Sequence, residues 1–284
     1  MGTSSSYNGP NKSPLLPPNF EFDDIEIEIN VSEEEDVESD VEVQEIDPDK
    51  TESESLENDK EEIVTWQSAK SSMTRFVKIS SQTPGRAISN YVKANGGSKN
   101  LAKSAKGGIR SAVALGTFGQ NVNNSSFKEA LNSLGFDWTD KSAKEILGLL
   151  VEKLSPNPNL KEDSVARKAM TETMIDFYNE LEEDQGIDSF ENLEKRQFDM
   201  LTTNYIIHYI YERIISELGK RFEENAENHE AAVKKEKEVK NYITAKVETS
   251  DKLKGIMSID FNDSKIISFI AAIYIECYSL LENI

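Results

Sequence analysis

The sequence has few of the side chains that most often build catalytic and metal sites. Its 284 residues include one cysteine, Cys277, and two histidines, His208 and His229. A single cysteine excludes an intramolecular disulfide and any zinc site built from several cysteines. Neither histidine occurs in an HExxH-type metal motif. We therefore expect no metal or other cofactor in this protein.

Long apolar runs are also missing. The most apolar stretch, residues 266–281, is shorter than the roughly 18 residues that suggest a membrane span, and it contains Glu276. The first residues lack the apolar stretch of a secretory signal. We expect a cytoplasmic protein that does not associate with a membrane and whose C-terminal helix is buried.

Charge is distributed very unevenly along the chain, whose formal net charge is −20. Residues 21–62 hold 21 acids and two lysines, whereas residues 63–136 hold ten Lys or Arg and one acid. The acidic stretch cannot bury enough apolar surface to offset the entropy of ordering, so residues 1–62 are predicted to form a disordered arm. Within this arm, residues 23–31 alternate apolar and acidic side chains, which favours a strand only when a partner surface binds them.

Helical patterns dominate from about residue 65 onward, and they predict an all-α fold. We expect a small basic helical segment punctuated by glycines over residues 63–136, and a helical bundle over residues 137–284. In the first segment, a short helix begins at Pro84 and ends at Gly96. Two further helices are expected on either side of the pair Gly107 and Gly108.

Helix boundaries can be expected from capping residues. Ser126 with Glu129, and Ser142 with Glu145, have the spacing of a capping box at the start of a helix. Asp263 is a candidate N-cap for the C-terminal helix. Long helices are predicted over residues 193–222 and 227–248. Between the two capping boxes and the two long helices, one further helix is expected. Its apolar stripe is formed by Val165, Ala169, Met170, Met174 and Phe177 and should be buried.

No catalytic motif is evident. The segment around Lys103 and Ser104 contains glycines and lysines but lacks the order of a phosphate-binding loop, because Ala102 stands where that motif has glycine. His208 lies in an apolar and aromatic run and is interpreted as a core or interface histidine. No Ser–His–Asp or Cys–His set has a local signature. We therefore expect a protein that is not an enzyme.

The basic segment is the better candidate for a functional surface. Nine Lys or Arg fall within residues 70–110. The aromatic residues Phe76 and Tyr91 lie among them, and Phe118 follows them. Such a surface suits a nucleic acid, an acidic partner protein, or the acidic arm of the same chain. The candidate contact residues are Arg75, Lys78, Arg86, Lys93, Lys99, Lys103, Lys106 and Arg110.

Three stretches of the sequence form recognisable blocks: "MGTSSSYNGP…SPLLPP" at the start, "TRFVKISSQTPGRAISNYVKANGGSKNLAKSAKGGIRSAVALGTF" at residues 74–118, and "ARKAMTETMIDF" further along. The first two blocks resemble the QatB family, one of the four components of Qat anti-phage defence systems, and the third extends the resemblance. The resemblance implies that the protein acts beside an ATPase, a QueC-like enzyme and a TatD-like nuclease. It also implies that the protein is the acceptor when the QueC-like enzyme joins a 7-deazaguanine to an N-terminal glycine.

In this sequence the acceptor would be Gly2. Removal of Met1 exposes an α-amine with an ordinary pKa of about 7.7–8.0, which is far more available near neutral pH than a lysine amine. Thr3, Ser4, Ser5 and Ser6 are small enough to enter a narrow enzyme tunnel, and Tyr7 is expected to anchor at its mouth. Residues 1–6 also match the pattern of an N-myristoylation signal. We discount this reading because an anionic membrane would repel the acidic arm that follows. The alternative function is a nucleic-acid adaptor that targets the nuclease through residues 63–136.

Overall fold

The computed structural model describes residues 64–181, 186–190 and 195–283. The predicted disordered arm, Gly2 and residues 3–7 lie outside these residues. Within the described ranges the chain forms helices and no strand, so the prediction of an all-α fold is confirmed. The elements are α1 (Trp66–Lys78), α2 (Gly85–Ala94), α3 (Gly97–Ser104), α4 (Lys106–Asn124), α5 (Phe127–Ser133), α6 (Ala143–Leu154), α7 (Lys161–Asn179), η1 (Gly186–Phe190), α8 (Lys195–Leu218), α9 (Lys220–Asn225), α10 (His229–Val247), α11 (Asp251–Lys254), η2 (Gly255–Ser258) and α12 (Ile266–Glu282).

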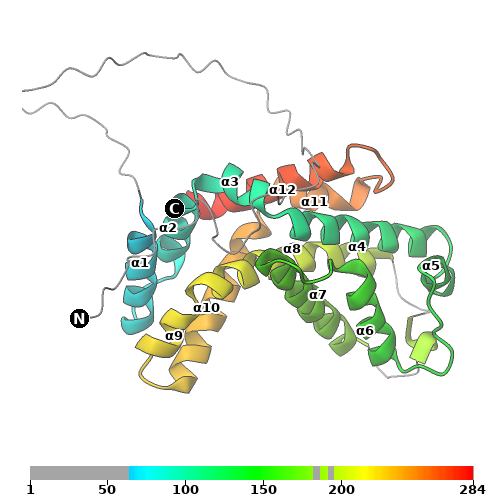
Figure 1. Cartoon of the computed structure of the whole chain (residues 1–284), viewed down its shortest axis with the longest axis horizontal. Helices are drawn as coiled ribbons and strands as arrows, with labels where there is room; N and C mark the ends of the chain where they lie inside the picture. The colour runs from blue at the N-terminus through cyan, green and yellow to red at the C-terminus, as the bar shows by residue number, and fades with distance from the viewer. Residues whose placement is uncertain (1–63, 182–185, 191–194, 284) are drawn as a thin grey trace, which may run out of the picture.

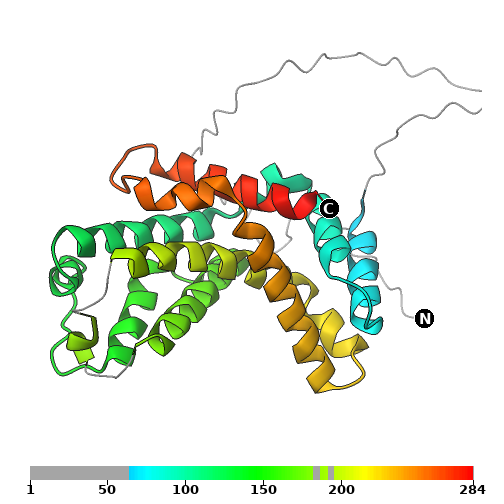
Figure 2. The same cartoon turned by 180° about the vertical axis from the view of Figure 1, so that it is seen from behind.

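The apolar helix α12 lies along one side of the molecule and contacts α2, α3, α4 and α10 (Figure 1). At one end of the molecule α1 packs on α2 and α9, and at the other end α5, α6 and η1 gather around the far end of α4. Seen from behind, α10 runs from the side of α12 down to α9 (Figure 2). Helix α12 therefore joins the N-terminal helices to the rest of the fold.

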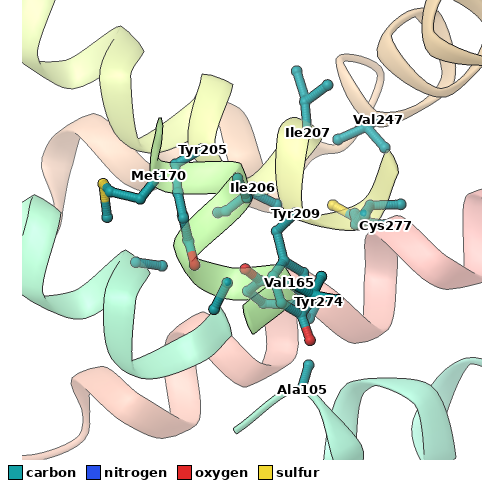
Figure 3. Close-up of a cluster of buried hydrophobic side chains, with 14 of the residues drawn as sticks. Ala105, Val165, Met170, Tyr205, Ile206, Ile207, Tyr209, Val247, Tyr274 and Cys277 are labelled. Atoms are coloured by element: carbon teal, nitrogen blue, oxygen red, sulfur yellow. The ribbon is translucent and has the colours of Figure 1, made fainter. Parts of the chain in front are cut away.

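Aromatic side chains fill the centre where α8 meets α12. Tyr209 and Tyr274 form a T-shaped pair with ring centroids 5.3 Å apart, and Tyr205 and Tyr278 extend this contact on either side at 6.4 Å. All four side chains are completely buried. Figure 3 shows three of these rings together with Met170 from α7. Edge-to-face pairs add about 0.5–1.5 kcal/mol each beyond the area they bury, so this cluster holds α8 and α12 together.

Several local predictions are confirmed. The Ser142 hydroxyl accepts a hydrogen bond from the Glu145 amide, and the Glu145 carboxylate accepts one from the Ser142 amide, which completes a capping box at α6. At α5, the Ser126 hydroxyl caps the amide of Glu129. Gly96 adopts a left-handed conformation with φ of +82°, which suits glycine and ends α2. The five residues of the predicted apolar stripe in α7 are all buried.

Three local predictions were wrong. Gly107 and Gly108 do not separate two helices, because the break falls at Ala105 and both glycines form the first turn of α4. Asp263 does not cap α12, since its carboxylate accepts the amide of Lys265 in the turn that precedes the helix. The long helix expected at residues 193–222 is interrupted at Gly219, where α8 gives way to α9.

The predicted boundary between residues 136 and 137 does not coincide with a gap in the hydrophobic core. Buried side chains from both sides, such as Leu115 of α4 and Ile210 of α8, belong to one contiguous cluster. Helix α4 contacts α7 and α8 directly. The division into a basic segment over residues 63–136 and a bundle over residues 137–284 describes charge along the chain, and as a division into domains it stays a prediction.

Candidate interaction surface

All eight candidate basic residues are exposed on the surface. They come from four consecutive helices: Arg75 and Lys78 from α1, Arg86 and Lys93 from α2, Lys99 and Lys103 from α3, and Lys106 and Arg110 from α4. Exposed lysines and arginines on one run of packed helices can contact an acidic partner without paying the cost of burying an unpaired charge. The structure thus places every predicted cation at the surface.

A first recess lies between α1 and α2 and has a volume of about 260 Å³. Its charged side chains are Arg75 and Arg86, and hydroxyl groups from Ser68, Ser71 and Thr83 line the space between them. No carboxylate lines this recess among the described residues. Guanidinium groups beside hydroxyl donors are the side chains that bind carboxylate and phosphate oxygens, so the recess suits an anionic group.

A second recess adjoins the first, because Ser71 and Arg75 line both. It is more open, with a volume of about 510 Å³, and its cations are Lys70, Arg75, Lys78 and Arg221. We call the two recesses together the α1 groove. Within the described part of the chain, no acidic side chain lines the α1 groove, so all of its charged lining residues are cationic.

Arg221 is the groove residue that the sequence did not suggest. It lies on α9, more than 140 positions after Arg75, and enters the groove because α9 packs on α1. The Phe76 and Phe222 rings, 6.4 Å apart in an edge-to-face arrangement, form part of that contact. Arg221 also pairs with Glu224 at 3.4 Å, which offsets part of its charge. No pattern along the chain identifies such a residue, because only helix packing brings it there.

The remaining candidates do not line the α1 groove. Arg110 lies at the start of α4 and forms an ion pair of 3.4 Å with the buried carboxylate of Asp163 on α7. It lines a different recess, of about 400 Å³, together with Lys153. By contrast, no ion pair to another described residue is formed by Arg75, Lys78, Arg86, Lys93, Lys99 or Lys103.

His208 is buried on α8, as the apolar run around it indicates. Its Nε2 atom lies 2.8 Å from a carboxylate oxygen of Asp176 on α7. Burial lowers the pKa of His208, the charge of Lys240 lowers it further, and Asp176 opposes both effects. The histidine therefore makes a contact between α7 and α8, which agrees with its interpretation as a core residue.

Two further observations concern metal binding and membrane-spanning helices. Among residues 64–181, 186–190 and 195–283, no three His, Cys, Asp or Glu side chains come together as a metal-binding group. Over the same described ranges, no helix has both the length and the apolar character needed to cross a bilayer. The N-terminal candidates Gly2, Thr3, Ser4, Ser5, Ser6 and Tyr7 lie outside the described residues.

Comparison with known proteins identifies the family. No curated protein and no solved structure shows a significant match to this chain. A family model described as "Qat anti-phage system associated protein QatB" matches residues 96–281. The match starts inside the second block of resemblance and ends at Leu281, near the end of α12, so it covers nearly all of the C-terminal half. Because this range covers more than half of the sequence, the chain belongs to the QatB family of Qat anti-phage system proteins.

Proposed function

We propose that this protein is the acceptor and scaffold of its Qat system, a role that requires no catalysis by the chain itself. In this role it presents Gly2 to a QueC-like enzyme, which conjugates a 7-deazaguanine to it. The observation that carries the proposal is the glycine at position 2, followed by the small residues Thr3 to Ser6. Family membership supports a function beside the other Qat components.

The chemistry of the proposed step is an acyl transfer. The enzyme first activates a carboxylate of the deazaguanine with ATP, which gives an acyl adenylate and releases pyrophosphate. The neutral α-amine of Gly2 then attacks the acyl carbon, a C–N bond forms, AMP leaves and the nitrogen loses a proton. Glycine has no Cβ, so its backbone can enter a narrower channel than any other residue permits.

The folded body supports a scaffold role in this proposal. It carries a strongly cationic α1 groove next to Val64, the first described residue after the N-terminal segment. An acidic surface on the ATPase, the QueC-like enzyme or the TatD-like nuclease could be held there through Arg75, Lys78 and Arg86. Charge complementarity of this kind increases the rate of association and fixes orientation.

Intact mass spectrometry tests the acceptor role. The protein is co-expressed with the QueC-like enzyme of its own system, and the N-terminal peptide is then sequenced by fragmentation. We expect a mass increase confined to Gly2, and we expect it to be lost in Gly2→Ala and when one residue is inserted before Gly2. The matched control is Gly9→Ala, which changes a glycine in the same stretch and should retain the modification.

Phage plating with the same variants links the modification to defence. Gly2→Ala and the insertion should abolish protection without changing the circular dichroism spectrum, whereas Gly9→Ala should protect like the parent. Full protection by both N-terminal variants would show that Gly2 is not the functional site.

A second candidate function is a nucleic-acid adaptor that brings the TatD-like nuclease to its target through residues 63–136. The observation that favours it is the α1 groove, where four cations without a described ion-pair partner lie close together. If the groove binds phosphates, Arg75→Gln and Lys78→Gln should each reduce the salt dependence of duplex DNA binding by about one unit of slope. Duplex binding that is absent at physiological salt would exclude this function.

A further inference from the structure

The acidic N-terminal segment joins the folded body beside the α1 groove. Val64 is the first described residue and itself lines the recess between α1 and α2. The residues before it therefore leave the body at the edge of the α1 groove. Any charge they carry is held close to Arg75 and Arg86 by the covalent connection.

The segment that leads into the groove is strongly acidic. Residues 51–62 contain six acids and one lysine. The groove presents Lys70, Arg75, Lys78 and Arg86, and none of these four forms an ion pair with a described residue. The net negative charge of the segment therefore nearly matches the positive charge of these four groove residues.

The segment is also long enough to follow the groove. Helix α1 has 13 residues and so measures about 20 Å, whereas twelve extended residues span up to about 40 Å. A chain that turns back at Val64 can thus run along the whole of α1. In that arrangement Leu56 comes within reach of Ile79, an exposed apolar side chain that lines the second recess.

We propose that residues 51–62 bind back along the α1 groove of the same molecule. The tether raises the effective concentration of the segment at the groove to the order of millimolar, so individually weak exposed ion pairs can add up to a stable contact. A polyanion or partner protein that uses the groove must first displace this segment. The proposal goes beyond the acceptor role of Gly2 and does not rest on it.

Distance measurements between two spin labels test the proposal on the full chain. One label is placed at Ser55→Cys within the segment and the other at Ser80→Cys, an exposed position just after α1 that lines neither recess. Native Cys277 is completely buried and will not take up label. We expect a narrow distance distribution in 50 mM NaCl that becomes broad in 1 M NaCl, because salt screens exposed charges.

Two matched controls separate docking from general compaction. Replacing Arg75, Lys78 and Arg86 by Gln should broaden the distribution at low salt, whereas replacing Lys144, Lys237 and Lys265, which lie outside the groove, should not. A label at Ser39→Cys in place of Ser55→Cys should give a broad distribution throughout. All of the lysines and arginines exchanged are exposed, so the fold should survive, which circular dichroism will verify.

A low-salt distribution that is broad, or that is narrow but unchanged in the groove variant, overturns the proposal. The α1 groove is then open to another protein or to a nucleic acid. Modification of Gly2 is read from the mass of the N-terminal peptide, so failure of the docking proposal is distinguishable from failure of the acceptor role.

Discussion

The Tyr209 hydroxyl donates a hydrogen bond of 2.7 Å to Oε1 of Glu162, which joins α8 to α7. The same carboxylate reaches the start of α4, where its oxygens accept the amides of Gly107 and Gly108 at 2.8 and 2.9 Å. These amides have no partner within their own helix, and the helix dipole favours a negative charge beside them. Glu162 thus serves as the cap of α4 that Ala105, at the N-cap position, cannot provide.

We predict that Glu162→Gln destabilises the protein by about 1–3 kcal/mol, because three donors face this side chain and an amide offers only one acceptor oxygen. In either orientation, the amide NH₂ would face a backbone N–H, that of Gly107 or that of Gly108. Urea unfolding followed by circular dichroism measures the change. The control is Glu152→Gln on the exposed face of α6, which should shift stability by less than about 0.5 kcal/mol. Equal effects of the two variants would contradict this role of Glu162.

Two helical glycines should respond in opposite ways to the same substitution. A Cβ at Gly116 of α4 would overlap the ring of Phe261, whereas a Cβ at Gly148 of α6 would meet no atom within 4 Å. We expect Gly148→Ala to stabilise by about 0.5–1 kcal/mol through helix propensity. Gly116→Ala should destabilise by about 1–3 kcal/mol through overpacking. Thermal unfolding of both variants measures these changes in stability. A stabilised Gly116→Ala would show that Phe261 moves away at little cost.

Acid should weaken the fold partly through His208. Because burial lowers its pKa in the folded state, the unfolded chain binds the proton more readily, and stability is lost as pH falls below about 6.5. Between about pH 7 and pH 5, the wild type should therefore lose more stability than His208→Gln, which cannot take up the proton. Urea titrations at several pH values measure this difference. His229→Gln, at an exposed position, should keep the pH dependence of the wild type. Parallel curves for wild type and His208→Gln would disprove the contribution.

The thiol of Cys277 should be unreactive in the native protein. Burial, followed by the nearby charge of Glu276, raises its pKa to about 12, so almost no thiolate is present at pH 8. We expect no reaction with a disulfide reagent such as DTNB in native buffer, and one thiol per chain in 6 M urea. Rapid labelling of the native protein would mean that α12 opens locally.

Local features of the fold were predictable from the sequence because their causes are local. The hydroxyl of Ser142 and the carboxylate of Glu145 lie three positions apart, and this spacing alone places the start of α6. The stripe from Val165 to Phe177 follows from the helical period. The pair Gly107 and Gly108 predicted a break between helices because glycines often end helices. Here, Glu162 caps their amides from another helix, and the Tyr209 ring approaches Gly108 too closely for a side chain.

The sequence by itself determined the helical class, the separation of charge, the position of Gly2 and the resemblance to the QatB family. These properties depend on residue types and on spacings of a few positions. Only the tertiary structure decided which cations share a groove. It placed Arg221 beside Arg75 and Lys78 through the packing of α9 on α1, and it turned Arg110 toward Asp163 instead. The physical reason is that contacts between distant segments depend on how apolar helix faces pack, and no charge pattern along the chain encodes that arrangement.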